Sequence, residues 1–247
     1  MKKYISIFVF LLICAAIQSH AASPALFQCV GASSSSDPCA NRGTAALYYN
    51  VDHPSGNTTA CISGGTTTVT LTNATASTDQ NHTPGGANSV LHEAGAKEYI
   101  SVAVTGKNYF DSAEGMVKIW FYPSGLTGAN YLFRAFVDAS NLLITTVNAT
   151  TGTVSLSHVG QGSNVGKTTT STVTKDQFNR VDIRWSYTNN QIAIRINGGS
   201  WEVDTDGDAV TAFAAEPSVV HIGLALGNVA DTYYTDDISL YTTSGIE

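Results

Sequence analysis

Aromatic and cationic residues recur in this sequence at spacings that could support sugar binding. Lys118, Trp120 and Tyr122 alternate along one strand-like run, which would place all three on one face of a sheet. Aromatic rings offer flat apolar faces, and charged groups offer strong hydrogen bonds. The sequence therefore predicts a carbohydrate-binding face with these members: Lys118, Trp120, Tyr122, Arg134, Arg184, Arg195 and Trp201. Burial of Trp120 between strands or under a loop is the competing interpretation.

Two acidic clusters are candidate metal sites. Asp204, Asp206 and Asp208 alternate around Gly207, and closely spaced carboxylates are ligands that Ca²⁺ selects. Asp236 and Asp237 adjoin in the last strand-like run and form the second candidate. A structural calcium is the expected cofactor. An ordinary turn at Asp206 and a solvated strand end at Asp236 are the alternatives.

Carboxylate pairs that could hydrolyse a glycan are scarce. That reaction needs two carboxyl groups roughly 5–9 Å apart. Glu93 and Glu98 flank a loop-like segment, and Glu202 with Asp204 favours a salt-bridging strand edge. The outward Tyr and Arg residues supply only part of the set that a polysaccharide lyase needs, and no Gly-x-Ser-x-Gly elbow is present. The chain is therefore expected not to be an enzyme.

The elements that must position these residues are strands. Only 13% of the residues are charged, Gly numbers 22, and strand-length runs alternate with Gly, Asn, Pro and Asp turns. No helical period separates these runs, which are 67–71, 99–104, 116–122, 131–137, 142–147, 154–158, 178–187, 191–196, 219–226 and 237–241. The pattern predicts an all-β fold in which two antiparallel sheets form a sandwich.

Alternation within the strands assigns their faces. Val181, Ile183 and Trp185 share one phase and are predicted to be buried, whereas Asp182 and Arg184 take the opposite phase. One dry face and one polar face per strand is the pattern of two sheets packed face to face.

The first 21 residues read as an export signal. Lys2 and Lys3 precede an apolar run from Ile5 to Ile17, and Ser19-His20-Ala21 is a small-x-small cleavage site. This short lysine-containing leader is typical of bacterial secretion, and no other segment predicts a membrane span. The formal net charge of −7 disfavours nucleic acid as a partner. The mature product is expected to be extracellular or periplasmic.

Residues 22–65 are expected to form a cysteine-containing N-terminal extension, followed by a jelly-roll domain over 66–247. After the leader, the chain has Cys29, Cys39 and Cys61. An exported protein meets an oxidising environment, so one disulfide and one unpaired thiol are expected. Cys29 with Cys39 closes a short loop and is the expected disulfide, while Cys39 with Cys61 stays open because connectivity does not follow from sequence.

Three segments resemble concanavalin A-like lectin and glucanase jelly rolls, and the nearest type is the laminin G-like bacterial module. They are MVKIWFYP at 116–123, FNRVDIRW at 178–185 followed by a hairpin ending at Gly199, and YYTDDISLY at 233–241. The resemblance covers 66–243. It implies a jelly roll that binds glycans, proteins or surface polymers, with an acid of the closing strand holding a structural calcium. Some relatives are glycan hydrolases or lyases.

These observations favour a secreted, non-catalytic binding module for an extracellular glycan or surface polymer. One alternative is a structural or adhesive subunit of an extracellular assembly that uses the odd cysteine. A polysaccharide hydrolase or lyase is the less favoured alternative.

Overall fold

A computed structural model describes the chain at residues 39, 44–52, 58–83, 86–95, 97–110, 112–126, 130–139, 141–148, 150–160, 163–204, 208–224 and 231–242. Backbone contacts divide the chain into two compact units, Met1–Ser36 and Asp37–Glu247, and every described residue belongs to the second. The expected leader and Cys29 lie outside the described residues. Among those described, no helix is long and apolar enough to cross a membrane.

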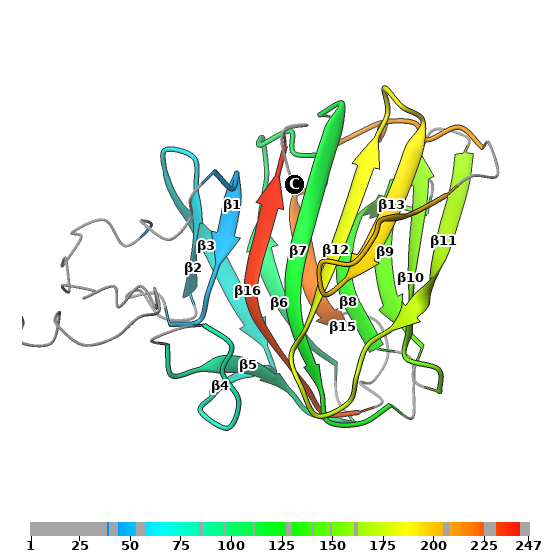
Figure 1. Cartoon of the computed structure of the whole chain (residues 1–247). Coiled ribbons are helices and arrows are strands. Elements are labelled where there is room, and N and C mark those ends of the chain that lie inside the picture. Colours follow the sequence, from blue (N-terminus) through cyan, green and yellow to red (C-terminus); the bar gives the residue numbers. More distant parts are fainter. Residues whose placement is uncertain are drawn as a thin grey trace, which may run out of the picture. The chain divides into compact units, whose positions relative to one another are not determined.

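The second unit is an antiparallel β-sandwich, as predicted (Figure 1). Its first sheet has the strand order β2 (Thr59–Ile62), β1 (Leu47–Tyr49), β16 (Tyr233–Tyr241), β7 (Glu114–Pro123), β12 (Asn179–Ser186), β13 (Gln191–Ile196) and β14 (Glu202–Val203). Two short strands, β4 (Thr75–Ser77) and β5 (Ser89–His92), continue from β16.

The second sheet lies behind the first in Figure 1. Its order is β3 (Gly65–Thr72), β6 (Glu98–Ala103), β15 (Val219–Leu224), β8 (Asn130–Asp138), β9 (Asn141–Val147), β10 (Thr153–Gly160) and β11 (Ser163–Thr172). Strands β2 and β3 form a hairpin, with Cys61 opposite Thr66. This hairpin joins the two sheets at one edge of the sandwich.

The core lies between the sheets and comes from the inward phase of each strand. Val181, Ile183 and Trp185 of β12 are all buried, which confirms the predicted alternation. The Trp185 indole needs space from the neighbouring strand. Gly115 is its cross-strand partner, and a Cβ at Gly115 would lie only 2.0 Å from Trp185 Cζ2. A glycine in β7 therefore makes room for the largest buried side chain.

The start of the sandwich differs from the expected boundary at residue 66. Strand β1 pairs with β16, and Leu47 lies opposite Leu240. Leu47, Tyr49 and Ala60 are buried in the core. Backbone contacts place the beginning of the unit at Asp37, so the later part of the segment assigned to an extension belongs to the sandwich. Short strands interrupted by Ser and Gly turns gave too weak a pattern to reveal this.

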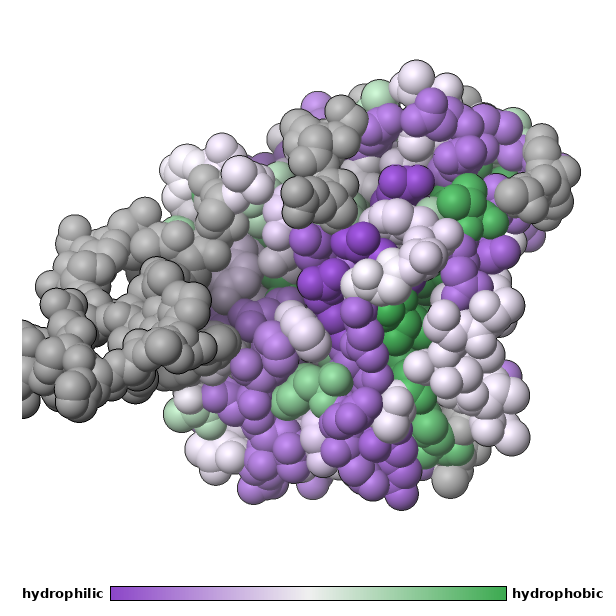
Figure 2. Space-filling view, viewed as in Figure 1, coloured by the Kyte–Doolittle hydropathy of each residue, from purple (hydrophilic) through white to green (hydrophobic). Residues whose placement is uncertain are grey.

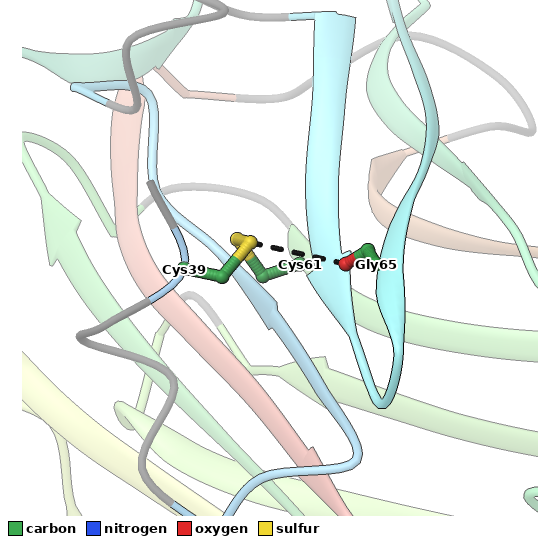
Figure 3. Close-up of a disulfide and its surroundings, with 3 residues drawn as sticks. All are labelled: Cys39, Cys61 and Gly65. Atoms are coloured by element: carbon green, nitrogen blue, oxygen red, sulfur yellow. Dashed lines mark hydrogen bonds between the residues drawn. A yellow bond between two sulfur atoms is a disulfide. The ribbon is translucent and has the colours of Figure 1, made fainter. Parts of the chain in front are cut away.

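The disulfide joins Cys39 to Cys61, and the expected Cys29–Cys39 pair is therefore wrong. Figure 3 shows the bond at β2, beside the hairpin with β3. The Sγ atom of Cys39 also lies 3.8 Å from the Gly65 carbonyl oxygen. Cys61 sits in a strand and is buried, so the bond anchors the chain before β1 to the sheet. Spacing alone favoured the shorter loop, but the strand pairing fixes which sulfur atoms meet.

Candidate functional site

The outward face of the first sheet carries charged and aromatic side chains in rows that run across the strands. In one row, Ser239 of β16 lies opposite Lys118 of β7, Lys118 opposite Asp182 of β12, and Asp182 opposite Arg195 of β13. The neighbouring rows place Trp120 opposite Arg180 and Met116 opposite Arg184. Figure 2 views this side and shows hydrophilic residues beside neutral ones and a hydrophobic strip.

Asp182 is the centre of an ion-pair network on this face. Its side chain is 0% exposed, Arg195 Nε donates a hydrogen bond of 2.6 Å to Oδ2, and Arg180 Nε lies 3.0 Å from Oδ1. A buried carboxylate is tolerated when such partners compensate its lost hydration. Two guanidinium groups share one carboxylate, so the network carries a net positive charge.

Trp201 lies beside this network at the entry to β14. Strand β14 pairs with β13, with Val203 opposite Ala193, which brings the preceding Trp201 close to Arg195. The Arg195 guanidinium carbon lies 4.4 Å from the Trp201 ring centroid, and that of Arg184 lies 4.8 Å from it. Both distances are within the range of cation–π attraction. We call Arg184, Arg195 and Trp201 the Trp201 cluster.

Lys118 forms a second cation–aromatic contact on the same face. Its Nζ lies 5.0 Å from the centroid of the Tyr241 ring. Tyr241 of β16 lies opposite Met116 of β7, in the row that also contains Arg184. The structure therefore brings four of the predicted residues to one region: Lys118, Arg184, Arg195 and Trp201.

Trp120 is covered by a loop, which was the competing interpretation of this residue. The His82 imidazole stacks on the Trp120 indole with ring centroids 3.5 Å apart, and the edge of Phe178 approaches His82 at 5.5 Å. Tyr122 makes edge contacts with Phe178 and Tyr234. These aromatic residues pack against each other, so this end of the face is occupied by the protein itself.

Asp236 and Asp237 hold that loop in place. A β-bulge in β16 interrupts the pairing with β7 between Asp236 and Ser239, and Asp237 has a left-handed φ of 45°. Asp236 Oδ2 accepts hydrogen bonds from the His82 N–H at 3.0 Å and from the Thr83 N–H and hydroxyl, both at 3.1 Å. Burial and the charge of Asp237 raise the pKa of Asp236.

Asp237 contacts the opposite side of the same network. Its Oδ1 accepts hydrogen bonds from Tyr48 Oη at 2.5 Å and Asn50 Nδ2 at 2.9 Å. Its Oδ2 lies 3.2 Å from His82 Nδ1 and accepts a hydrogen bond from Thr83 Oγ1 at 3.0 Å. Burial and the Asp237 carboxylate raise the pKa of Tyr48, which keeps that hydroxyl a donor. We call this arrangement the loop latch.

The carboxylates of the loop latch accept hydrogen bonds from the protein, and the expected calcium at Asp236 and Asp237 stays a prediction. Each of the four carboxylate oxygens of Asp236 and Asp237 accepts a hydrogen bond or faces an imidazole nitrogen. Within the described residues, no group of three or more His, Cys, Asp or Glu side chains could hold a metal ion.

At the other acidic cluster, Asp206 lies outside the described residues, and Asp208 is exposed. The Asp204 N–H donates to the Ile192 carbonyl at 3.0 Å, which continues the β14 pairing. The expected calcium at Asp204, Asp206 and Asp208 stays a prediction.

Arg134 lies on the other sheet, apart from the residues with which it was grouped. It sits in β8, opposite His221 of β15 and Ile144 of β9, and its guanidinium carbon is 3.8 Å from the Phe136 ring centroid. Burial lowers the pKa of Arg134, and burial together with Arg134 lowers the pKa of His221. Alternation identified Arg134 as outward-facing, but it could not say to which sheet its strand belongs.

The carboxylate pairs considered for catalysis have structural partners. Glu202 accepts hydrogen bonds from the Thr170 and Ser171 backbone, which ties β14 to β11. Burial acts to raise the pKa of Glu202, but these hydrogen bonds outweigh it and lower the pKa. Glu98 Oε2 accepts a hydrogen bond from the Glu93 N–H at 2.5 Å, and burial raises the pKa of Glu98.

Three members of this face escaped sequence analysis: His82, Arg180 and Tyr241. Arg180 and Tyr241 share the outward phase of Asp182 and Ser239, so alternation would have included them. His82 lies in a loop without periodicity, and only the tertiary structure brings it to Trp120.

Comparison with solved structures supports the fold. The binding domain of botulinum neurotoxin serotype G is 8% identical, with a TM-score of 0.58 over 80% of this chain and 47% of that one. The binding domain of botulinum neurotoxin DC in complex with SialylT is 10% identical, with a TM-score of 0.61 over 82% of this chain and 48% of that one. This chain spans about half the length of these domains.

A third similar structure is that of botulinum neurotoxin type C, whose cell entry depends on interaction with two ganglioside molecules. It is 9% identical, with a TM-score of 0.61 over 83% of this chain and 49% of that one. No protein-family model and no curated protein matches the chain. At such low identities the similarity shows only that the fold is shared. The ligands of this protein must be inferred from its own residues.

Proposed function

We propose that this protein is a secreted, non-catalytic module that binds an extracellular glycan or surface polymer through the outward face of its first sheet. The Trp201 cluster carries the proposal, because it joins an aromatic ring to two cations on a rigid sheet. Sugar-binding sites combine a flat apolar surface with directed polar groups in the same way. The sandwich is proposed to be a concanavalin A-like jelly roll of the laminin G type.

The ligand is proposed to bind at the β13–β14 end of the face. At the β16 end, His82 covers Trp120, and the Asp236 and Asp237 hydrogen bonds hold this cover. Trp201 is only partly buried and contacts side chains that rise from β12 and β13. A partly exposed ring held by two guanidinium groups suits stacking against a sugar.

Two observations support a binding role over catalysis. Glu202 and Asp182, the carboxylates nearest the Trp201 cluster in the strand pairing, are both engaged as acceptors. Two of the similar solved structures are binding domains, and the cell entry of botulinum neurotoxin type C, the third, depends on interaction with gangliosides. The fold alone hosts many functions, so the site's residues carry more weight than the likeness.

The test is a binding screen of the mature protein against immobilised neutral and acidic polysaccharides. Trp201→Ala should weaken binding at least tenfold because it removes the stacking surface. Phe136→Ala is a matched control, since Phe136 also lies against an arginine but on the second sheet. Binding that is unchanged in Trp201→Ala, or absent for every polymer, contradicts the proposal. Reducing ends or unsaturated products released from these polymers would reveal an enzyme instead.

A further inference from the structure

Four cations lie close together in the Trp201 region of the first sheet. Lys118, Arg180, Arg184 and Arg195 all belong to the outward phase of the first sheet, although the chain as a whole has 19 acidic and 12 basic residues. Asp182 is the acidic residue in their rows on β7, β12 and β13, while Glu114 in the next row of β7 and Glu202 beside Trp201 accept hydrogen bonds from other residues. These rows therefore hold four cations and one carboxylate.

Arg184 is the cation without a carboxylate partner in the described part of the chain. Both oxygens of Asp182 are occupied, since Oδ2 accepts from Arg195 and Oδ1 faces Arg180. Arg184 instead contacts the Trp201 ring. A guanidinium that rests on an aromatic face keeps planar N–H groups whose geometry matches carboxylate and sulfate oxygens. Arg184 is thus held in position and still able to bind an anion.

We propose that the Trp201 cluster selects acidic polysaccharides, with Arg184 binding a carboxylate or sulfate group while the sugar ring packs on Trp201. This inference rests on the proposed function and names its ligand class. Arg195 is fixed by Asp182 and positions the indole, whereas Lys118 lies one strand further along the same face and adds a second positive charge.

The acidic remainder of the protein does not prevent such binding. Charges separated by more than about 8 Å are largely screened at physiological ionic strength. Neighbouring strands are roughly 4.8 Å apart, so Lys118 on β7 is one strand from Arg184 on β12, whereas charges more than two strands away contribute little. Binding should consequently weaken as salt concentration rises.

The experiment compares matched polymers by affinity electrophoresis and titration calorimetry. Dextran sulfate against dextran tests the sulfate group, and polygalacturonate against its carboxyl-reduced form tests the carboxylate. We expect the wild-type protein to bind at least one acidic polymer at least tenfold more tightly than its neutral partner. Arg184→Gln should abolish this preference, while Arg134→Gln on the second sheet should preserve it. Thermal melting verifies that both variants are folded.

Each outcome separates the inference from the proposed function. Equal affinity for acidic and neutral polymers would overturn the selectivity and leave glycan binding intact. A preference that survives in Arg184→Gln, or that Arg134→Gln removes equally, would overturn the location. The absence of binding to all four polymers and to the wider screen would overturn both proposals.

Discussion

Acidification should destabilise the sandwich because two histidines are buried in the neutral form. His92 is 0% exposed, lies 3.3 Å from the Glu98 carbonyl through Nδ1 and 3.0 Å from Thr235 Oγ1 through Nε2, and stacks on Tyr233. A carbonyl only accepts, so Nδ1 carries the proton and Nε2 accepts from Thr235. Burial lowers the pKa of His92 to about 4, and burial likewise lowers the pKa of His158 to about 4.

The size of the effect follows from proton linkage. An unfolded histidine titrates near pH 6.5, so each residue binds its proton about 2.5 pH units earlier in the unfolded chain, which corresponds to about 3 kcal/mol. This stability is complete above pH 6.5 and is lost as the pH falls toward 4. Both residues together amount to about 6 kcal/mol, a large part of the roughly 5–15 kcal/mol that stabilises a typical domain.

Two carboxyl groups have the opposite effect on how stability depends on pH. Burial raises the pKa of Asp236 and of Glu98, so these groups contribute stability in acid that is lost as the pH rises through their folded pKa. They act against the histidines. The contribution of a histidine is therefore isolated by comparing the wild type with a variant that lacks it.

The assay is urea unfolding of the wild type, His92→Gln and His158→Leu at several pH values between 7 and 4.5. Each replacement should reduce the pH slope of the unfolding free energy by up to about 1.4 kcal/mol per pH unit near pH 5. His158→Leu should cost little at pH 7, because neither His158 nitrogen has a hydrogen-bond partner in another described residue. Slopes identical to that of the wild type would refute the reasoning.

Two further predictions concern the loop latch and the disulfide. Asp236→Ala removes the acceptor of three hydrogen bonds from His82 and Thr83, and should lower the unfolding free energy by about 2–4 kcal/mol while changing the Trp120 environment. Tryptophan fluorescence and urea unfolding measure it, and a stability loss below 0.5 kcal/mol contradicts the latch. Replacing Cys39 and Cys61 by Ser opens a loop with a sequence separation of 22, which should cost about 3 kcal/mol, or roughly 6–12 °C in melting temperature. Peptide mapping that found Cys29 bonded to Cys39 in the wild type would contradict this pairing.

The strand pattern in the sequence was sufficient for the architecture of the later part of the chain. Ile183 and Trp185 follow a strict period of two, and the sheet buries that phase. The period failed at β16, where the bulge turns Asp236 and Asp237 toward the same network of partners. In the sequence, Asp236 and Asp237 resemble a metal site because they are adjacent carboxylates. The residue that donates hydrogen bonds to Asp236, Thr83, lies more than 150 residues earlier in the chain.

The candidate face was predictable only in part, because alternation assigns a residue to a side of its strand but not a strand to a sheet. Arg134 and Arg184 are both outward by their period, yet β8 and β12 belong to opposite sheets. Order within a sheet depends on long-range pairing, such as β16 beside β7. Trp120 illustrates the other limit, since His82 reaches it from a loop whose sequence has no periodic signal.

The two ends of the first sheet's outward face therefore differ in what satisfies their side chains. At the β16 end, carboxylates, hydroxyls and rings bind each other through the loop latch and the His82–Trp120 stack, so an incoming sugar would have to displace these contacts. At the β13–β14 end, Asp182 pairs with Arg195 and Arg180, whereas Arg184 contacts the Trp201 ring and has no carboxylate partner among the described residues. A ligand gains most where a preorganised group still lacks a partner. This difference, more than the number of aromatic residues, favours the Trp201 cluster as the binding end.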